Sequence, residues 1–285
     1  MQVGSSSVAV WEYGDPAGRA VFVFHGVPAC GAGFAWADEP AADRGLRLIA
    51  PDRPGVGRST PRDGWRVGDY PAMVDALADA MGVDRYAAWG YSGGGPYAAA
   101  VAALATGRVS AAAISAGMGE IGDGWASFDD FEKTDAQFLR MSRRRPTLAR
   151  VFLRVAALGA RMSPKAAMKS FAGQMSTSDR AVLDQLGAPK DAMRLFTEAF
   201  VSGSRGVVAD YAALAQPWGV DLGATRIPVS VWQGTADTMV PPRHADGYVS
   251  RIPGATLVTW NGEGHLGTVT HAPDILDWLS EHAPR

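Results

Sequence analysis

Short apolar runs recur along the chain and predict buried strands. They are Val21 to Phe24, Leu46 to Ala50, Tyr86 to Trp89, Ala111 to Ser115, Val229 to Gln233 and Thr256 to Trp260. Several are unbroken rather than alternating, which is the pattern of parallel strands covered by helices on both faces. The early segment Val8 to Tyr13 predicts a further, antiparallel strand at an edge of the same sheet.

Segments with helical periodicity separate most of these strands. The clearest predicts a helix from Asp69 to Met81, with its first residue as the cap, Pro71 in the first turn and Gly82 ending it. The same strand-then-helix order recurs from Tyr86 to Leu104 and from Val229 to Val249, which predicts right-handed βαβ units in one sheet. The fold class that we predict is therefore α/β, with a doubly wound, mostly parallel sheet.

The alternation stops between about Met118 and Pro217, where apolar residues recur only at helical spacing. This pattern predicts a helical cap, residues 118–217, inserted into a core made of residues 1–117 and 218–285. Arginines that could attract an anionic substrate group spread around the cap helices, but we interpret them as solvated surface charge: Arg140, Arg143, Arg144, Arg145, Arg150, Arg154 and Arg161.

Composition narrows the class of protein. The 285 residues are 47% hydrophobic and 20% charged, which fits one main globular α/β domain. A formal net charge of -2 gives no electrostatic reason to bind nucleic acid. Cys30 is the single cysteine, so neither an intramolecular disulfide nor a cysteine zinc site is expected, and a cytoplasmic location fits best. We expect no secretion signal and no membrane insertion, because the longest apolar run, Tyr97 to Ala105, is too short.

One short stretch carries the pattern of a catalytic nucleophile. Gly90-Tyr91-Ser92-Gly93-Gly94 fits G-x-S-x-G, and it stands between a predicted strand and the helix-forming run from Tyr97. Glycines at positions 90 and 94 remove side chains where such a turn brings strand and helix together. The alternative is a glycine-rich turn in which Ser92 only caps the helix that follows.

A serine alcohol needs a histidine to take its proton and a carboxylate to orient that histidine. His265 is the candidate base, because it lies in the glycine-bounded loop after the last predicted strand; the other histidines are His25, His244, His271 and His282. Asp237 is the candidate acid, because it follows the strand Val229 to Gln233, where catalytic groups of parallel sheets gather. The alternatives are that Asp237 only caps a turn, and that Asp246 or Asp221 supplies the carboxylate.

Acyl transfer also needs two backbone amides that stabilise the oxyanion of the tetrahedral intermediate. Gly93 follows the nucleophile and is one predicted donor. The second should come from the loop His25-Gly26-Val27-Pro28, where Val27 is the candidate because Pro28 has no amide hydrogen. His25 is expected to brace this loop.

These stretches together resemble the α/β-hydrolase superfamily. The resemblance rests on His25-Gly26-Val27-Pro28, the segment Asp52 to Ser59, the elbow at Ser92, Gly234-Thr235-Ala236-Asp237 and Gly264-His265. It implies a mobile cap over the site, a turn beside the site at Asp52 to Ser59, and no metal or organic cofactor. A serine nucleophile sets the chain apart from haloalkane dehalogenases and epoxide hydrolases, which use an aspartate. The elbow also departs from the Gly-Gly-Ser-Trp-Gly pattern of proline iminopeptidases.

The predicted function is hydrolysis of a carboxylic ester, lactone or thioester of a small, largely apolar substrate, through an acyl-enzyme on Ser92. Some apolar cap residues would line its pocket, although most should only pack the cap helices: Phe128, Phe131, Phe138, Met141, Phe171, Met175 and Phe196. Alternatives with the same fold are carbon-carbon bond hydrolysis, acyl transfer, peptidase or perhydrolase chemistry, and a non-catalytic small-molecule receptor. The sequence leaves the oligomeric state open.

Overall fold

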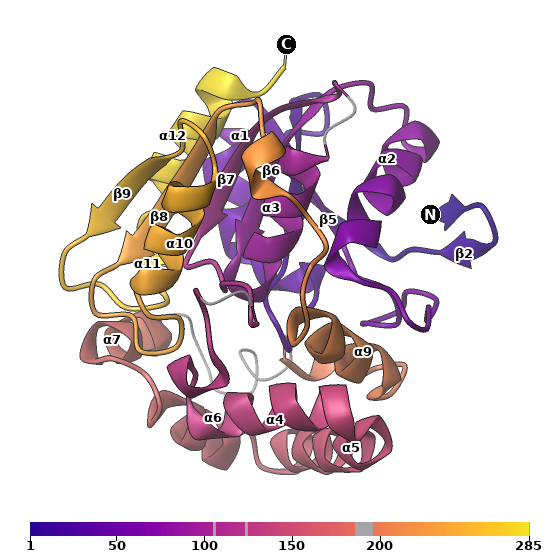
Figure 1. Ribbon diagram of the computed structural model, residues 1–285, viewed down its shortest axis with the longest axis vertical. Helices are drawn as coiled ribbons and strands as arrows, with labels where there is room; N and C mark the ends of the chain where they lie inside the picture. The colour runs from indigo at the N-terminus through magenta and orange to yellow at the C-terminus, as the bar shows by residue number, and fades with distance from the viewer. Residues whose placement is uncertain (105–106, 123–124, 186–195, 285) are drawn as a thin grey trace.

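A seven-stranded sheet forms the centre of the computed structural model, which describes residues 1–104, 107–122, 125–185 and 196–284 (Figure 1). The strand order is β3-β5-β4-β6-β7-β8-β9, and β3 is antiparallel to β5 while all other neighbours are parallel. The strands are β3 (Val10–Gly14), β4 (Arg19–Phe24), β5 (Leu46–Pro51), β6 (Tyr86–Tyr91), β7 (Val109–Ser115), β8 (Val229–Gly234) and β9 (Thr256–Trp260). The predicted α/β fold with its antiparallel edge strand is confirmed. A small hairpin, β1 (Gln2–Val3) and β2 (Ser6–Ser7), precedes the sheet.

Helices cover both faces of this sheet, which explains the unbroken apolar runs. In β4, Phe22 and Phe24 pack into the core on one side, while Val21 and Val23 pack into the core on the other. The first side carries α2 (Tyr70–Ala80), α3 (Gly95–Ala103) and α10 (Arg243–Arg251), and the second carries α1 (Asp38–Ala42) and α12 (Ala272–His282). Because successive side chains of a strand point to opposite faces, most positions of the central strands are buried.

The structure corrects one detail of the predicted helix at residues 69–81. Asp69 does not cap α2: its backbone is helical (φ -82°, ψ -17°), and its carboxylate accepts a hydrogen bond from Arg66 N at 2.8 Å. That bond caps the start of the preceding 3-10 helix η2 (Val67–Asp69). Asp69 therefore caps η2, one turn before the helix that it was predicted to cap. Pro71 does lie in the first turn of α2, and Gly82 follows its end with a φ of 66°. Ala105, the predicted end of the next helix, lies outside the described residues.

The chain between β7 and β8 forms a group of helices, here called the inserted helices. They are α4 (Lys133–Arg144), α5 (Pro146–Met162), α6 (Pro164–Ala172), α7 (Thr177–Gln185) and α9 (Arg205–Leu214). In the described part of this stretch, the single β interaction is the isolated bridge between Ile121 and Ala126. The division into core and cap at residues 118 and 217 stays a prediction, and residues 123–124 and 186–195 lie outside the described part.

The remaining elements are short and join these layers. They are the 3-10 helices η1 (Gly31–Ala37), η3 (Ser92–Gly94), η4 (Phe128–Asp130) and η5 (Leu222–Ala224) and the helix α11 (Gly267–Thr270). Within the described residues, no helix combines the length and the apolarity that crossing a bilayer requires.

Candidate active site

Ser92 lies at a sharp turn between β6 and α3. Its φ of 56° falls in the left-handed region that side chains seldom adopt. The turn depends on its glycines, because a Cβ at Gly90 would collide with the carbonyl oxygen of Gly94, and one at Gly94 would collide with that of Phe24. The Ser92 hydroxyl does not cap α3, whose capping residue is Gly94 without a side-chain bond. The turn therefore presents the Ser92 side chain away from its own helix.

The structure brings Ser92, His265 and Asp237 together in one hydrogen-bonded chain. His265 Nε2 lies 3.0 Å from Ser92 Oγ, and His265 Nδ1 lies 2.9 Å from Asp237 Oδ2. The three residues follow β6, β9 and β8, so the carboxyl ends of three parallel strands place them at one edge of the sheet. His265 and Asp237 are both 4% exposed, which keeps water away from the bond between them.

The Asp237 carboxylate is held from both sides. Oδ2 also accepts a hydrogen bond from Gln233 Nε2 at 3.1 Å, while Oδ1 accepts from the amides of Met239 and Val240, each at 2.9 Å. Asp237 thus also caps its own turn, which fixes the orientation of the oxygen that faces His265. Gln233, at the end of β8, was not foreseen from sequence.

The two alternative carboxylates lie elsewhere. Asp221 accepts a hydrogen bond from Gly223 N and caps η5, and Asp246 is exposed on α10. Neither side chain has a described hydrogen bond to His265, so Asp237 is the one of the three carboxylates that the described contacts pair with His265.

The surroundings of His265 favour its charged form. Burial opposes that form, but the charge and the hydrogen bond of Asp237 outweigh it, and Asp179 and Asp135 add to the effect. The pKa of His265 is therefore raised above its ordinary value of 6.5. Asp179, on α7, also accepts a hydrogen bond from Leu266 N at 2.6 Å, so an inserted helix holds the residue next to His265.

The other four histidines are held by different partners. His25 Nδ1 lies 2.8 Å from Gly26 O, and burial and the Arg53 charge lower the pKa of His25. His244 Nε2 lies 2.9 Å from Asp130 Oδ2. The ring of His271 stacks on Trp260 at the end of β9, and the ring of His282 stacks on Trp278 of α12.

The two predicted oxyanion donors lie side by side next to Ser92. A Cβ at Gly93 would lie 3.2 Å from Val27 N, and one at Gly26 would lie 3.4 Å from Ser92 Oγ. The loop after β4 and the turn after β6 therefore approach each other closely, and Val27 and Gly93 border the same small cavity. Such paired N–H groups suit an oxygen that gains negative charge during reaction.

A buried ion pair supports the loop that carries Val27. Arg53 and Asp210 are 0% and 1% exposed and lie 2.7 Å apart between Nη2 and Oδ2. The Arg53 guanidinium also donates to the carbonyl oxygens of His25 and Gly26, and Tyr97 OH donates to Asp210 at 2.7 Å. Arg53 belongs to the segment predicted to shape a turn beside the site, whereas Asp210 on α9 was not foreseen.

A small cavity of about 30 Å³ opens over Ser92. The inserted helices and the segment before α4 close it with Phe131, Asp135, Leu139 and Tyr211, and the core residues that line it are Val27, Ser92, Gly93, Met118, Met239, Val240 and His265. Tyr211 OH donates to Asp135 Oδ1 at 3.1 Å, and burial raises the pKa of Asp135 despite that bond. Neither residue was singled out from sequence.

Of the seven apolar cap residues named from sequence, one lines the cavity and most of the others pack within the protein. Phe131 lines the cavity, whereas the others pack among helices or, in the case of Phe171, lie partly exposed on α6. The seven cap arginines are all exposed, and none borders the cavity. Arg140, for example, forms an ion pair with Asp129. Among the described residues, no group of three or more His, Cys, Asp or Glu side chains is arranged to hold a metal ion.

The chain is similar to known proteins in sequence family and in fold. Residues 19–272 match the sequence family described as alpha/beta hydrolase fold, whereas no curated protein sequence matches the chain. A hydrolase from Pseudomonas aeruginosa PA01 is 22% identical, with a TM-score of 0.70 over 100% of this chain and 97% of that one. The esterase RhEst1 from Rhodococcus sp. ECU1013 is 21% identical (TM-score 0.71; 99% and 97% covered). The enol-lactonase from Burkholderia xenovorans LB400 is 17% identical (TM-score 0.69; 98% and 97% covered). At these identities the likeness shows a shared fold.

Proposed function

We propose that this chain, which belongs to the alpha/beta hydrolase fold family, is a serine hydrolase that cleaves a carboxylic ester through an acyl-enzyme on Ser92. The observation that carries the proposal is the 3.0 Å separation between His265 Nε2 and Ser92 Oγ, continued to Asp237 on the other side of the ring. A base within hydrogen-bond reach of a nucleophile, itself oriented by a third group, is the arrangement that activates an alcohol.

In the acylation step, Ser92 Oγ attacks the ester carbonyl carbon while its proton moves to His265 Nε2. Asp237 stays ionised, holds the Nδ1 proton of His265 and stabilises the imidazolium that forms. The amides of Val27 and Gly93 donate to the oxyanion of the tetrahedral intermediate. The intermediate collapses when the imidazolium gives its proton to the leaving alcohol oxygen.

Deacylation uses the same groups in reverse. His265 takes a proton from a water molecule, whose oxygen attacks the acyl carbon, and then returns the proton to Ser92 Oγ. The products are the free serine and a carboxylic acid. No step requires a group beyond this chain, the substrate and water.

The substrate that fits this site is small and mostly apolar, with one polar feature. Val27, Met118 and Leu139 supply apolar walls, while Asp135 and Tyr211 supply the polar group on the side of the inserted helices. The cavity of about 30 Å³ is small beside the hundreds of Å³ of typical small-molecule pockets, which favours esters with short acyl chains.

Labelling with a fluorophosphonate tests the proposal. The probe phosphonylates a serine only when a base activates it, so the wild-type protein should label and Ser92→Ala should not. His265→Ala should label at least about 10³-fold more slowly, since the base is lost. His271→Ala is the matched control, because the half-buried His271 stacks on Trp260 and has no described hydrogen bond to Ser92, His265 or Asp237, so labelling should be unchanged. Labelling that survives Ser92→Ala would overturn the assignment of the nucleophile.

A panel of nitrophenyl esters with acyl chains of increasing length separates an enzyme from a receptor with an idle triad. We expect turnover of short acyl chains in wild type and none in Ser92→Ala. If Ser92 labels but esters, lactones and thioesters all remain intact, ester hydrolysis is not the function.

A further inference from the structure

Helix α5 carries a stripe of exposed apolar side chains, here called the α5 face. Its members recur at intervals of three, four and seven residues: Leu148, Val151, Phe152, Val155, Leu158 and Met162. Val155 is 63% exposed and Met162 is 78% exposed. The opposite side of the helix is buried through Ala149, Leu153, Ala157 and Ala160, so the α5 face is not needed for packing within the chain.

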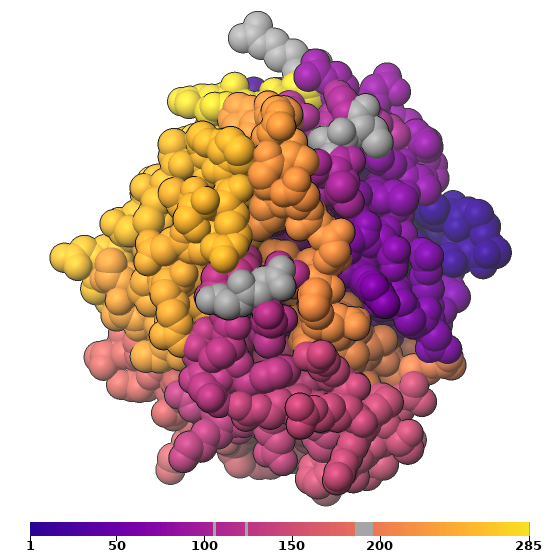
Figure 2. Space-filling model, viewed as in Figure 1, coloured from indigo at the N-terminus to yellow at the C-terminus, as the bar shows by residue number. Residues whose placement is uncertain are grey.

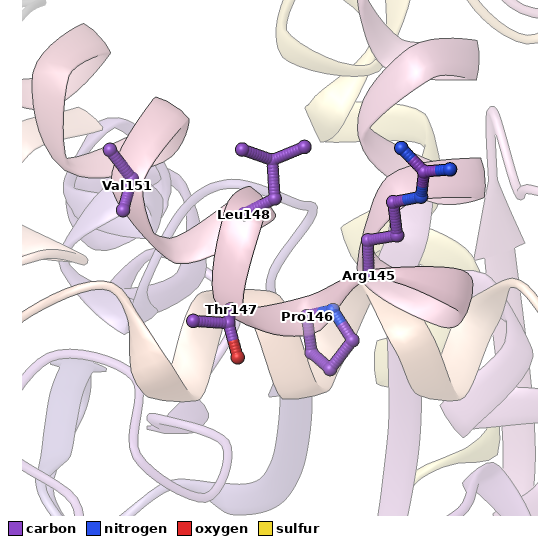
Figure 3. Close-up of a pocket in the computed structure, with 5 residues that line it drawn as sticks. All are labelled: Arg145, Pro146, Thr147, Leu148 and Val151. Atoms are coloured by element: carbon purple, nitrogen blue, oxygen red, sulfur yellow. The ribbon is translucent and has the colours of Figure 1, made fainter.

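This concentration is specific to one part of the molecule. Of the eleven large apolar side chains that are exposed in the described residues, seven lie in α5 and α6. At the start of the α5 face, an open hollow of about 390 Å³ is lined by Arg145, Pro146, Thr147, Leu148 and Val151. Figure 3 shows Leu148 and Arg145 projecting to the same side of the chain at this point. Scattered apolar residues are normal on a surface, but a contiguous stripe marks a binding surface.

The same segment is strongly basic. From Lys133 to Ala172 the chain holds ten Lys and Arg residues and one acidic residue, Asp135, although the whole chain has a formal net charge of -2. Within the described part of the chain, no acidic side chain forms a salt bridge with these exposed cations: Arg144, Arg145, Arg150, Arg154, Lys165 and Lys169. At 3.6 residues per turn, Arg150 and Arg154 lie together along one edge of the apolar stripe. The α4 to α6 segment forms the lower edge of the molecule in Figure 2.

We propose that the α5 face docks this protein on the surface of an anionic phospholipid bilayer. An apolar stripe bordered by arginines is the pattern of a helix that lies in the plane of the membrane interface, with its apolar side chains among the acyl chains and its cations against the headgroups. The other occupants fit less well. A second copy docked through the same face would bring two strongly basic segments close together, and a nucleic acid would leave the apolar stripe in water.

Docking through the α5 face would place the membrane next to the helices that close the cavity over Ser92. Helix α4 packs directly against α5 and carries Asp135 and Leu139, which line the cavity over Ser92. The bound surface therefore holds the helices that close the cavity, while the sheet edge with Ser92 lies behind them. Esters that partition into the bilayer would reach the protein at this face.

Sedimentation with phospholipid vesicles tests the proposal directly. At low ionic strength the wild-type protein should sediment with vesicles of phosphatidylcholine and phosphatidylglycerol, at least tenfold more strongly than with pure phosphatidylcholine, and salt should release it. Each basic residue at an anionic surface changes binding about fivefold, so Arg150→Gln/Arg154→Gln should weaken it about thirtyfold. Val155→Ser/Leu158→Ser should weaken binding to a similar extent through the apolar contact.

Matched control variants change the same residue types elsewhere on the surface. Arg62→Gln/Arg85→Gln removes two exposed arginines, and Val201→Ser/Leu257→Ser removes two exposed apolar side chains; both should bind vesicles like wild type. Equal weakening by the controls, or undiminished binding by the α5 variants, would overturn the proposal. A wild-type protein that does not bind anionic vesicles, but that forms a dimer in solution, would also overturn it. If Val155→Ser/Leu158→Ser dissociated that dimer, the α5 face would be assigned to contact with a second copy of the chain. If Val155→Ser/Leu158→Ser fails to fold, the vesicle binding of Arg150→Gln/Arg154→Gln tests the proposal.

Discussion

Replacing Arg53 by methionine should damage both stability and catalysis, by separate routes. The substitution keeps most of the side-chain volume but removes the guanidinium that pairs with Asp210 and binds the carbonyl oxygens of His25 and Gly26. Among the described residues, Asp210 would keep only the Tyr97 hydroxyl as a hydrogen-bond partner, at a position that is 1% exposed. The loop that carries Val27 would lose two of its anchors.

The expected magnitudes follow from this burial. Leaving one partner of a buried ion pair unpaired costs about 3 to 5 kcal/mol in the free energy of unfolding. For 285 residues the entropy of unfolding is about 0.6 kcal/mol per degree, so the midpoint of thermal unfolding should fall by about 5 to 8 °C. If the Val27 amide loses its alignment, kcat should fall by up to about 10²-fold with little change in KM, because an oxyanion donor acts in the transition state.

Two assays on two variants separate these effects. Urea unfolding measures the stability of Arg53→Met and of Arg53→Met/Asp210→Leu, and the double variant should recover part of the loss because the orphaned charge is gone. Ester kinetics at a temperature where both remain folded should show the same low kcat in both, since neither restores the loop anchors. A wild-type kcat in the single variant would refute the positioning role of Arg53, and a loss below about 1 kcal/mol would refute the energetic argument.

Three further predictions concern the site itself. The value of kcat/KM should rise with pH through the raised pKa of His265, above 6.5, because the protonated ring cannot accept the Ser92 proton; a profile that is flat from pH 5 to 8 would contradict this role. Asp237→Asn should lower kcat by about 10⁴-fold, and the pKa of His265 measured by NMR should fall because the main charge that raises it is removed; an unchanged pKa would show another cause. Asp135→Leu should raise KM for esters that carry a hydroxyl or amino group and leave KM for plain alkyl esters within about twofold, so equal effects on both would exclude a recognition role.

The sequence predicted those parts of the site that local chemistry determines. Ser92, Asp237 and His265 each stand in a glycine-containing loop directly after an apolar strand, and parallel strands bring such loops to one edge of a sheet. The same logic led to the prediction that the amides of Val27 and Gly93 donate to the oxyanion, and both residues border the cavity over Ser92. Their positions depend on strand order and turn geometry, and both of these are visible as short patterns along the chain.

The sequence did not reveal the contacts that depend on how the inserted helices pack. Asp135 and Tyr211 reach the cavity, and Asp210 reaches Arg53, only because α4 and α9 lie over the strand ends. Periodicity gives the buried face of a helix but not its neighbour. One signal was available: Asp210 stands on an otherwise apolar helix face, where an acidic residue implies a buried partner. The prediction that Asp69 caps α2 was wrong because a capping residue needs a non-helical backbone, whereas the backbone of Asp69 is already helical.

Detection of the acyl-enzyme on Ser92 tests the central claim most directly. The protein would be mixed with a nitrophenyl ester, quenched in acid within milliseconds and digested, and the peptide that contains Ser92 would be weighed by mass spectrometry. The account predicts a peptide heavier by one acyl group, formed at the rate of nitrophenol release, absent in Ser92→Ala and formed at least about 10³-fold more slowly in His265→Ala. Ester turnover with the acyl group on another residue, or turnover that persists in Ser92→Ala, would contradict it.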